Sequence, residues 1–304
     1  MKFTAPPPLK KGDTIGIVAT ARWRAPEGLQ RAKSHLEVLG YKVKIHPNNA
    51  LRLHEWAGSP KERGAAFTDY WCDPEIKMIL CAAGGTRTLH MMQYLDWEKL
   101  KGYNKIIMGF SDATALINAL SVRLNIVTYH GPDAGHFSRE EPQPFIDDFL
   151  VHLTGEPETE DKWDEARILR YGEASGELVG GNLCIFNYLM GTKDQPDLKG
   201  KILFIEDEME ELRNIDRMLI HLKRAGHMEH IAGLMVGGFT MNLNGGRVPF
   251  PYTVEDLINE HTEGMHIPVI MDAPFGHGES MKILPIGMKA TLKAVKTGVT
   301  FKLG

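Results

Sequence analysis

The sequence has few cysteines, no strong excess of charge of either sign and no long apolar run. Its 304 residues include 3 cysteines, without the spacing of a disulfide framework or a zinc site. A formal net charge of −4 argues against binding to nucleic acid or anionic membranes. The longest apolar run, 231–239, is far shorter than the roughly 18 residues of a membrane-spanning helix. The N-terminus also lacks the apolar segment of a signal peptide, so we expect a cytoplasmic globular protein.

The first half of the chain alternates between short apolar runs and helical patterns. Helical spacing of apolar residues follows Pro26 and stops at Gly40, and residues 59–62 read Ser-Pro-Lys-Glu, a capping box that opens a second helix. Strands are predicted at 14–19, 41–45, 76–81, 105–110 and 126–129. Strands that alternate with helices favour a parallel sheet, so we predict an α/β domain over residues 1–155.

The second half has fewer helical patterns and more glycine. A polar segment rich in Glu and Asp, at about 154–165, is typical of an exposed linker, and we place that linker at 156–172. Further strands are expected around 201–206, 234–237, 268–271 and 292–303, with one clear helix ending at Gly226. We therefore predict a second, smaller, β-rich domain over residues 173–304.

The most specific local pattern is Gly109-Phe110-Ser111-Asp112, where a strand ends and a helix begins. A serine on such a turn presents its hydroxyl at the carboxyl end of the sheet, where helical N–H groups can stabilise an oxyanion. The pattern departs from G-x-S-x-G because Ala113 stands in place of the second glycine. Two interpretations stay open for Ser111, a catalytic nucleophile and an ordinary helix N-cap.

A glycine pair, Gly84-Gly85, follows another predicted strand and is expected at the same edge of the sheet as Ser111. Glycines there allow the backbone to approach a ligand closely, although the pair is equally consistent with a tight turn. Neither G-x-G-x-x-G nor a Walker-type motif occurs, which argues against a bound nucleotide cofactor.

A serine nucleophile needs a base and a group that orients the base. His277 lies in a glycine-flanked loop after a strand, and Glu206 ends an apolar strand. Glu208, Glu210 and Glu211 are expected to be ordinary solvated carboxylates. The fragment 227–230, His-Met-Glu-His, has no third ligand, so we predict no metal site.

Four segments together resemble the LD-carboxypeptidases, the serine peptidases that include murein tetrapeptide carboxypeptidase and the microcin C immunity peptidases. The resemblance runs from about Lys11 to Gly287 and rests on segments 109–112, 180–183, 205–207 with 216–219, and 274–278. It implies a flavodoxin-like N-terminal domain and a β-rich C-terminal domain. It also implies a catalytic triad divided between them, with Ser111 as nucleophile, His277 as base and Glu206 as the orienting group.

Further site residues are implied by the same resemblance. The N–H groups of Asp112 and Gly85 would form the oxyanion hole, and Gly84, Arg87 and Asn182 would bind substrate. The family commonly has an arginine just before the glycine pair, where this chain has Ala83. Arg87 is the nearest arginine that follows in the sequence and is our candidate for its replacement.

These expectations amount to a cytoplasmic LD-carboxypeptidase that needs no cofactor and removes the terminal D-alanine from murein tetrapeptides. A homodimer is implied by the resemblance alone. One alternative is an immunity-type peptidase of the same family, which would hydrolyse a toxic peptidyl nucleotide. A second alternative is a non-catalytic small-molecule binding module in which Ser111 is only a helix cap.

Overall fold

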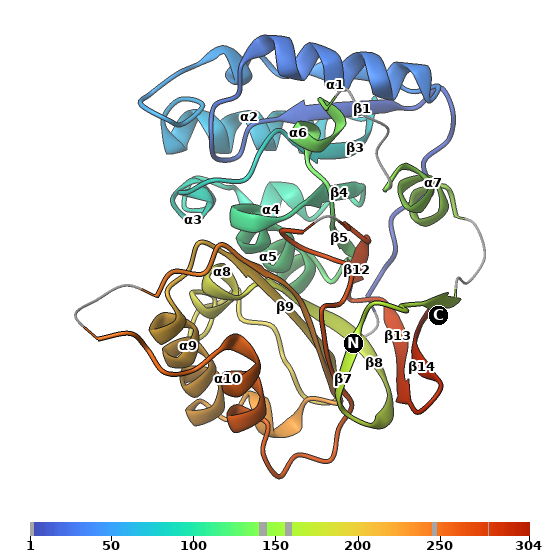
Figure 1. Cartoon of the computed structure of the whole chain (residues 1–304). Helices are drawn as coiled ribbons and strands as arrows, with labels where there is room; N and C mark the ends of the chain where they lie inside the picture. The colour runs from blue at the N-terminus through green and yellow to red at the C-terminus, as the bar shows by residue number, and fades with distance from the viewer. Residues whose placement is uncertain (1–2, 140–144, 156–159, 245–247, 279) are drawn as a thin grey trace. The chain divides into compact units, whose positions relative to one another are not determined.

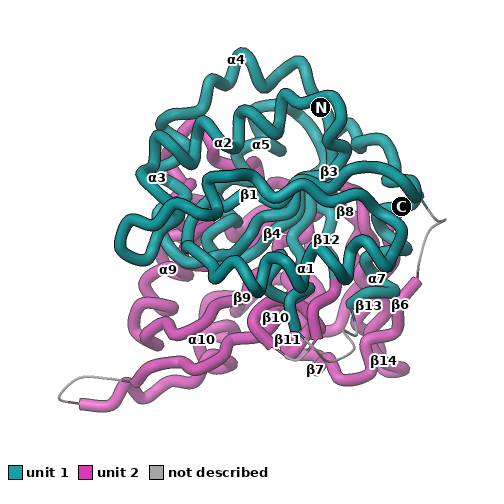
Figure 2. Tube along the Cα trace, turned by 90° about the horizontal axis from the view of Figure 1, so that it is seen from above, with its two compact units in different colours: residues 1–156, 283–285 teal, residues 157–282, 286–304 magenta. Residues whose placement is uncertain are grey.

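The protein is described from a computed structural model. The structure describes residues 3–139, 145–155, 160–244, 248–278 and 280–304. The chain divides into two compact units, shown in separate colours in Figure 2. Unit 1 comprises residues 1–156 and 283–285, and unit 2 comprises 157–282 and 286–304. The short return to unit 1 interrupts the contiguous C-terminal domain that the sequence suggested.

Unit 1 is built on a six-stranded sheet with the order β12-β5-β4-β3-β1-β2 (Figure 1). Its strands are β1 (Thr14–Val18), β2 (Lys42–Ile45), β3 (Ile76–Cys81), β4 (Ile106–Gly109), β5 (Thr128–His130) and β12 (Leu284–Ile286). The pairs β1–β2, β1–β3, β3–β4 and β4–β5 are all parallel. The order of β1 to β5 is that of flavodoxin-like folds, so the predicted fold class is confirmed.

Short helices connect the strands of unit 1. They are α1 (Pro26–Val38), α2 (Pro60–Cys72), α3 (Thr88–Met92), α4 (Trp97–Leu100), α5 (Thr114–Leu124), α6 (Ala134–Phe137) and α7 (Ile146–Thr154), with 3₁₀ turns η1 (Pro47–Ala50) and η2 (Ser111–Ala113). Helix α1 packs against β2 and α6, α2 against β1 and β3, and α5 against β4 and β5. The predicted capping box at the start of α2 is confirmed, because Ser59 and Glu62 exchange their hydrogen bonds.

Unit 2 contains a mixed eight-stranded sheet with the order β6-β14-β13-β8-β9-β10-β11-β7. The strands are β6 (Glu160–Lys162), β7 (Arg167–Arg170), β8 (Gly172–Asn182), β9 (Ile202–Glu208), β10 (Gly233–Thr240), β11 (Val269–Met271), β13 (Lys289–Val295) and β14 (Gly298–Leu303). Its helices are α8 (Leu183–Asn187), α9 (Leu212–Arg224) and α10 (Val254–His261), with the 3₁₀ turn η3 (Met228–His230). A second domain rich in strands was predicted, and the sheet confirms it.

The segment predicted as an exposed linker, 156–172, is only partly described, and its described part is not a linker. Strand β6 pairs with β14, and β7 pairs with β11. Between them Trp163 is buried and stacks on Phe301 with ring centroids 4.6 Å apart. The acidic composition misled the prediction because β6 and β7 lie at the two edges of the sheet, where charged side chains reach solvent.

Candidate active site

Ser111 lies on a sharp turn between β4 and the helical segment that includes α5. Its φ of +57° places a non-glycine residue in the left-handed region, a conformation that the surrounding structure must enforce. A methyl group at Gly109 would lie 2.9 Å from Cys81 Sγ, so only glycine lets the turn pack this closely. The N-cap of η2 is Phe110 and the N-cap of α5 is Ala113, and neither helix has a side-chain capping hydrogen bond at that position. The turn was predicted correctly, and Ser111 occupies neither N-cap position because it is the first residue of η2.

The glycine pair after β3 lies beside this serine, as the parallel sheet predicts. A methyl group at Gly84 would lie 2.8 Å from Ser111 Cβ and 3.0 Å from Ser111 Oγ. Gly85 has φ +124°, which L side chains rarely adopt. The N–H of Asp112 belongs to the first helical turn, whose N–H groups have no partner within the helix. Unit 1 therefore brings Ser111, Asp112 and the glycine pair together.

A buried aspartate fixes one member of the pair. The N–H of Gly84 donates to Asp133 Oδ2 at 3.2 Å, and Asp133 Oδ1 lies 2.9 Å from His136 Nδ1. Burial raises the pKa of the Asp133 carboxyl, but the hydrogen bonds from His136 and Gly84 and nearby positive charge outweigh it and lower that pKa overall. Since Gly84 uses its N–H here, Gly85 is the member whose N–H can reach a ligand.

The carboxylate of Asp112 has a separate structural contact. Its Oδ2 accepts the N–H of Thr88 at 2.8 Å, which fixes the start of α3. Burial raises the pKa of this carboxyl above its ordinary value, although the bonds from Thr88 oppose the shift. The side chain thus shapes the loop after the glycine pair, while the backbone of the same residue faces the turn at Ser111.

Arg87 and Arg22 differ in how their guanidinium groups are held. The Arg87 guanidinium lies over the ring of Trp56, 4.7 Å from its centroid. Arg22 lies directly beside the glycine pair, because a methyl group at Gly85 would be 2.9 Å from Arg22 Cβ. Arg22 was not among the residues expected to bind substrate, because that prediction rested on arginines close to the glycine pair along the chain. Its position just after β1, the strand beside β3, was the available signal.

In unit 2, Glu206 and His277 form a tight pair. His277 Nδ1 lies 2.5 Å from Glu206 Oε2, and the His277 N–H donates to the same oxygen at 3.1 Å. Glu206 is fully buried. Gly276 is required beside it: φ is +88°, and a methyl group there would lie 2.6 Å from Glu206 Cβ. We assign the ring proton to Nδ1, which then donates to Glu206. In this tautomer Nε2 is the nitrogen that can accept a proton.

Among the described residues, three carboxylates shift the pKa of His277. Burial lowers the pKa of the imidazole, but the hydrogen bond and charge of Glu206, with the charges of Glu208 and Asp207, outweigh burial and raise the pKa above its ordinary value. The protonated form of the ring is therefore stabilised.

Glu208 does not behave as the solvated carboxylate that the sequence analysis expected. Its Oε2 lies 3.5 Å from His277 Nε2, and 38% of its side chain is exposed. The expectation failed because β9 continues through Glu208 instead of turning after Glu206. Residues two apart on a strand share a face, so both carboxylates project toward the histidine.

Asn182 and Asp207 have contacts within unit 2 that hold the start of α8. Asn182 Oδ1 accepts the N–H of Ile185 at 3.1 Å, and its Nδ2 donates to Asp207 Oδ1 at 2.9 Å. Asp207 also accepts the N–H groups of Cys184 and Glu208. Burial is the main cause that raises the pKa of Asp207 to about 6. Asn182, expected to bind substrate, is 6% exposed.

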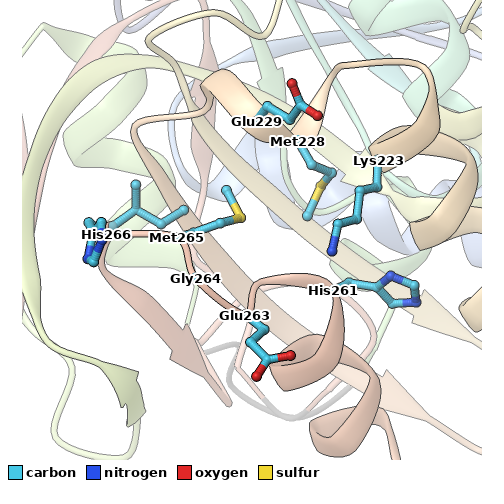
Figure 3. Close-up of a pocket in the computed structure, with 9 residues that line it drawn as sticks. Lys223, Met228, Glu229, His261, Glu263, Gly264, Met265 and His266 are labelled. Atoms are coloured by element: carbon cyan, nitrogen blue, oxygen red, sulfur yellow. The ribbon is translucent and has the colours of Figure 1, made fainter.

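A cavity of about 390 Å³ lies in unit 2 near the ends of α9 and α10 (Figure 3). Its lining includes Lys223, Glu229 and His261 but none of the predicted site residues. His261 Nε2 lies 2.8 Å from Asp216 Oδ1, a hydrogen-bond contact between α10 and α9. In the parts of the chain that are described, no three metal-ligating side chains are grouped to hold an ion. Across the same residues, no helix has the length and apolar character needed to cross a bilayer.

Family models match both halves of the chain. Residues 15–131 match the N-terminal domain and residues 175–292 the C-terminal domain of LD-carboxypeptidases. The chain belongs to the LD-carboxypeptidase family, and the suspected resemblance is confirmed. It is 33% identical to the probable murein peptide carboxypeptidase of Bacillus subtilis, over 97% of this chain and 93% of the relative.

Other family members differ in their named activities. The microcin C7 self-immunity protein of Escherichia coli is 28% identical, over 94% of this chain and 92% of the relative. The crystal structure of muramoyltetrapeptide carboxypeptidase from Oxalobacter formigenes superposes with a TM-score of 0.86 at 28% identity, covering 96% of this chain and 98% of that one. A protein similar to the immunity protein, from Bacillus anthracis, gives 0.88 at 28% identity over 99% of both chains. Membership of this family makes the protein a peptidase.

Proposed function

We propose that this protein is a serine carboxypeptidase that removes the terminal D-alanine from murein tetrapeptides by hydrolysing an L,D-peptide bond. The observation that carries the proposal is the conformation of Ser111, a left-handed serine at a strand-to-helix turn with Gly84 against its side chain. Strain of this kind is typical of an exposed nucleophile. Two relatives are named murein peptide carboxypeptidase and muramoyltetrapeptide carboxypeptidase, which supports the substrate class.

In the proposed mechanism, Ser111 Oγ attacks the carbonyl carbon before D-alanine while His277 Nε2 accepts the hydroxyl proton. The N–H groups of Asp112 and Gly85 stabilise the oxyanion, and Glu206 stabilises the imidazolium. Collapse of the tetrahedral intermediate breaks the C–N bond, and His277 returns the proton to the departing amine. Water then attacks the acyl-enzyme while His277 accepts its proton; the ester bond to Ser111 Oγ breaks, His277 returns the proton to Oγ, and the tripeptide is released. A cytoplasmic location is a prediction from the sequence, and a homodimer is a prediction from the family resemblance.

The direct test is Ser111→Ala assayed on a panel of peptides. Mass spectrometry would follow release of D-alanine from tetrapeptides with lysine or meso-diaminopimelate at the third position, with a peptidyl nucleotide included. We expect cleavage of a tetrapeptide by the wild type and a loss in the variant of about 10⁴-fold or more in kcat. Labelling of the wild type, but not the variant, by a fluorophosphonate would separate an enzyme from a binding module.

Ser59→Ala is the matched control because Ser59 is a true helix cap. Its Oγ accepts the N–H of Glu62 at 3.3 Å at the start of α2. Losing the cap should reduce the free energy of unfolding by about 1 kcal/mol and leave kcat unchanged. Full activity in folded Ser111→Ala would contradict the assignment of the nucleophile. Preferential cleavage of the peptidyl nucleotide would support the immunity-type alternative.

A further inference from the structure

Arg22 is an exposed cation at the glycine loop, and its guanidinium has no ion-pair partner among the residues that the structure describes. Its backbone N–H donates to Gly84 O at 3.3 Å. Its Nε lies 3.6 Å from the position that a methyl group would take at Gly85. The same glycine pair lies against Ser111, so a charged group is held next to the proposed oxyanion hole.

The topology of the sheet makes this place a binding position. Strand β1 lies between β2 and β3 in the sheet. The chain adds β2 on one side of β1 and then adds β3, β4 and β5 on the other side. In open α/β sheets, ligands bind beyond the carboxyl ends of the strands at such a switch point. The loop after β1 carries Arg22, and the loop after β3 carries the glycine pair. Arg22 is therefore positioned at the edge where this fold class holds its ligands.

Three other arginines of unit 1 are engaged in contacts within it. Arg63 is buried and donates to the backbone oxygens of Thr20 and Gly58. Arg52 lies over the ring of Trp23, 4.5 Å from its centroid. Arg87 lies over Trp56 in the same way. Arg22 differs from these three because, within the described part of the chain, no aromatic ring or carbonyl holds its guanidinium.

We propose that Arg22 binds the free C-terminal carboxylate of the peptide substrate, an inference that rests on the proposed function. In a substrate cleaved before its last residue, the terminal carboxylate carbon is separated from the scissile carbonyl carbon by one nitrogen and one Cα. Standard bond lengths keep these two carbons within about 4 Å. A cation that recognises the carboxylate must therefore lie beside the oxyanion donors, as Arg22 lies beside Gly85. A guanidinium can hold both carboxylate oxygens at once.

The experiment compares one tetrapeptide that ends in free D-alanine with the same peptide ending in D-alanine amide. For the wild type we expect kcat/KM to be roughly 10- to 100-fold higher on the free acid, the range of a charge-assisted hydrogen-bonded pair. Arg22→Gln should lose most of this preference because its kcat/KM on the free acid falls. Arg22→Lys should keep part of the preference. Arg52→Gln is the matched control, and its preference should equal that of the wild type.

Binding is measured in parallel by calorimetry in the Ser111→Ala background, so that the result does not depend on turnover. Tighter binding of the free acid that disappears with Arg22→Gln supports the proposal. Equal binding of the two peptides, or a preference that survives Arg22→Gln and is lost in Arg87→Gln, overturns it. Absence of cleavage by the wild type would contradict the proposed function, while the binding comparison still decides the role of Arg22.

Discussion

Glu206 and Glu208 contact opposite nitrogens of His277, and replacing each with glutamine should have opposite effects on activity in acid. Glu206 Oε2 lies 2.5 Å from Nδ1 inside the core, and Glu208 Oε2 lies 3.5 Å from Nε2. Glu206→Gln removes the charge that stabilises the imidazolium and allows the wrong tautomer of the ring. We expect kcat to fall by roughly 10²–10⁴-fold at every pH, which corresponds to about 3–5 kcal/mol of lost transition-state stabilisation.

Glu208→Gln should instead increase activity in acid. In the proposed mechanism only neutral His277 accepts the serine proton, so kcat/KM is expected to fall as the pH drops through the pKa of the ring. Glu208 contributes to raising that pKa, and removing its charge lets the ring lose its proton at lower pH. Two charges 3.5 Å apart interact by about 1 kcal/mol in a water-like dielectric, which fits a side chain that is 38% exposed. This energy corresponds to an increase of about fivefold in kcat/KM on the acid limb.

The assay is a pH profile of kcat/KM for both variants on one tetrapeptide, with circular dichroism to verify folding. Glu210→Gln is the matched control, because Glu210 Oε1 accepts hydrogen bonds from Glu211 N and Asn214 Nδ2 that glutamine can also accept. On the alkaline plateau Glu208→Gln should stay within about threefold of the wild type. An equal loss in Glu206→Gln and Glu208→Gln at all pH values would refute this division of roles.

Two glycine substitutions test the close approaches that form the site. Gly84→Ala places a methyl group 3.0 Å from Ser111 Oγ; we expect kcat to fall by roughly tenfold or more through displacement of the nucleophile, with a smaller change in KM measured in the same assay. Gly276→Ala adds strain at φ +88° and a contact of 2.6 Å with Glu206 Cβ; we expect a loss of about 1–3 kcal/mol in the free energy of unfolding, measured by urea denaturation. Wild-type kcat in the first variant, or unchanged stability in the second, would contradict the respective argument.

The sequence by itself determined the local features. The capping box at Ser59, the strand that ends at Gly109 and the turn at Ser111 depend on residues within a few positions of one another. Alternation of strands and helices likewise determined that the first half has a parallel sheet. These signals are readable because backbone geometry at a cap or a turn restricts which residues fit there.

The tertiary structure alone decided which distant segments meet. Strand order places the loop after β1 beside the loop after β3, so Arg22 meets a glycine pair more than sixty residues away in the sequence. The extent of β9 decides that Glu208 shares a face with Glu206, and Gly276 allows the histidine loop to approach them. The acidic composition of segment 156–172 suggested a linker, but the described part of this segment forms the edge strands β6 and β7. Pairing register and packing fix these features, and both depend on contacts between segments far apart in the chain.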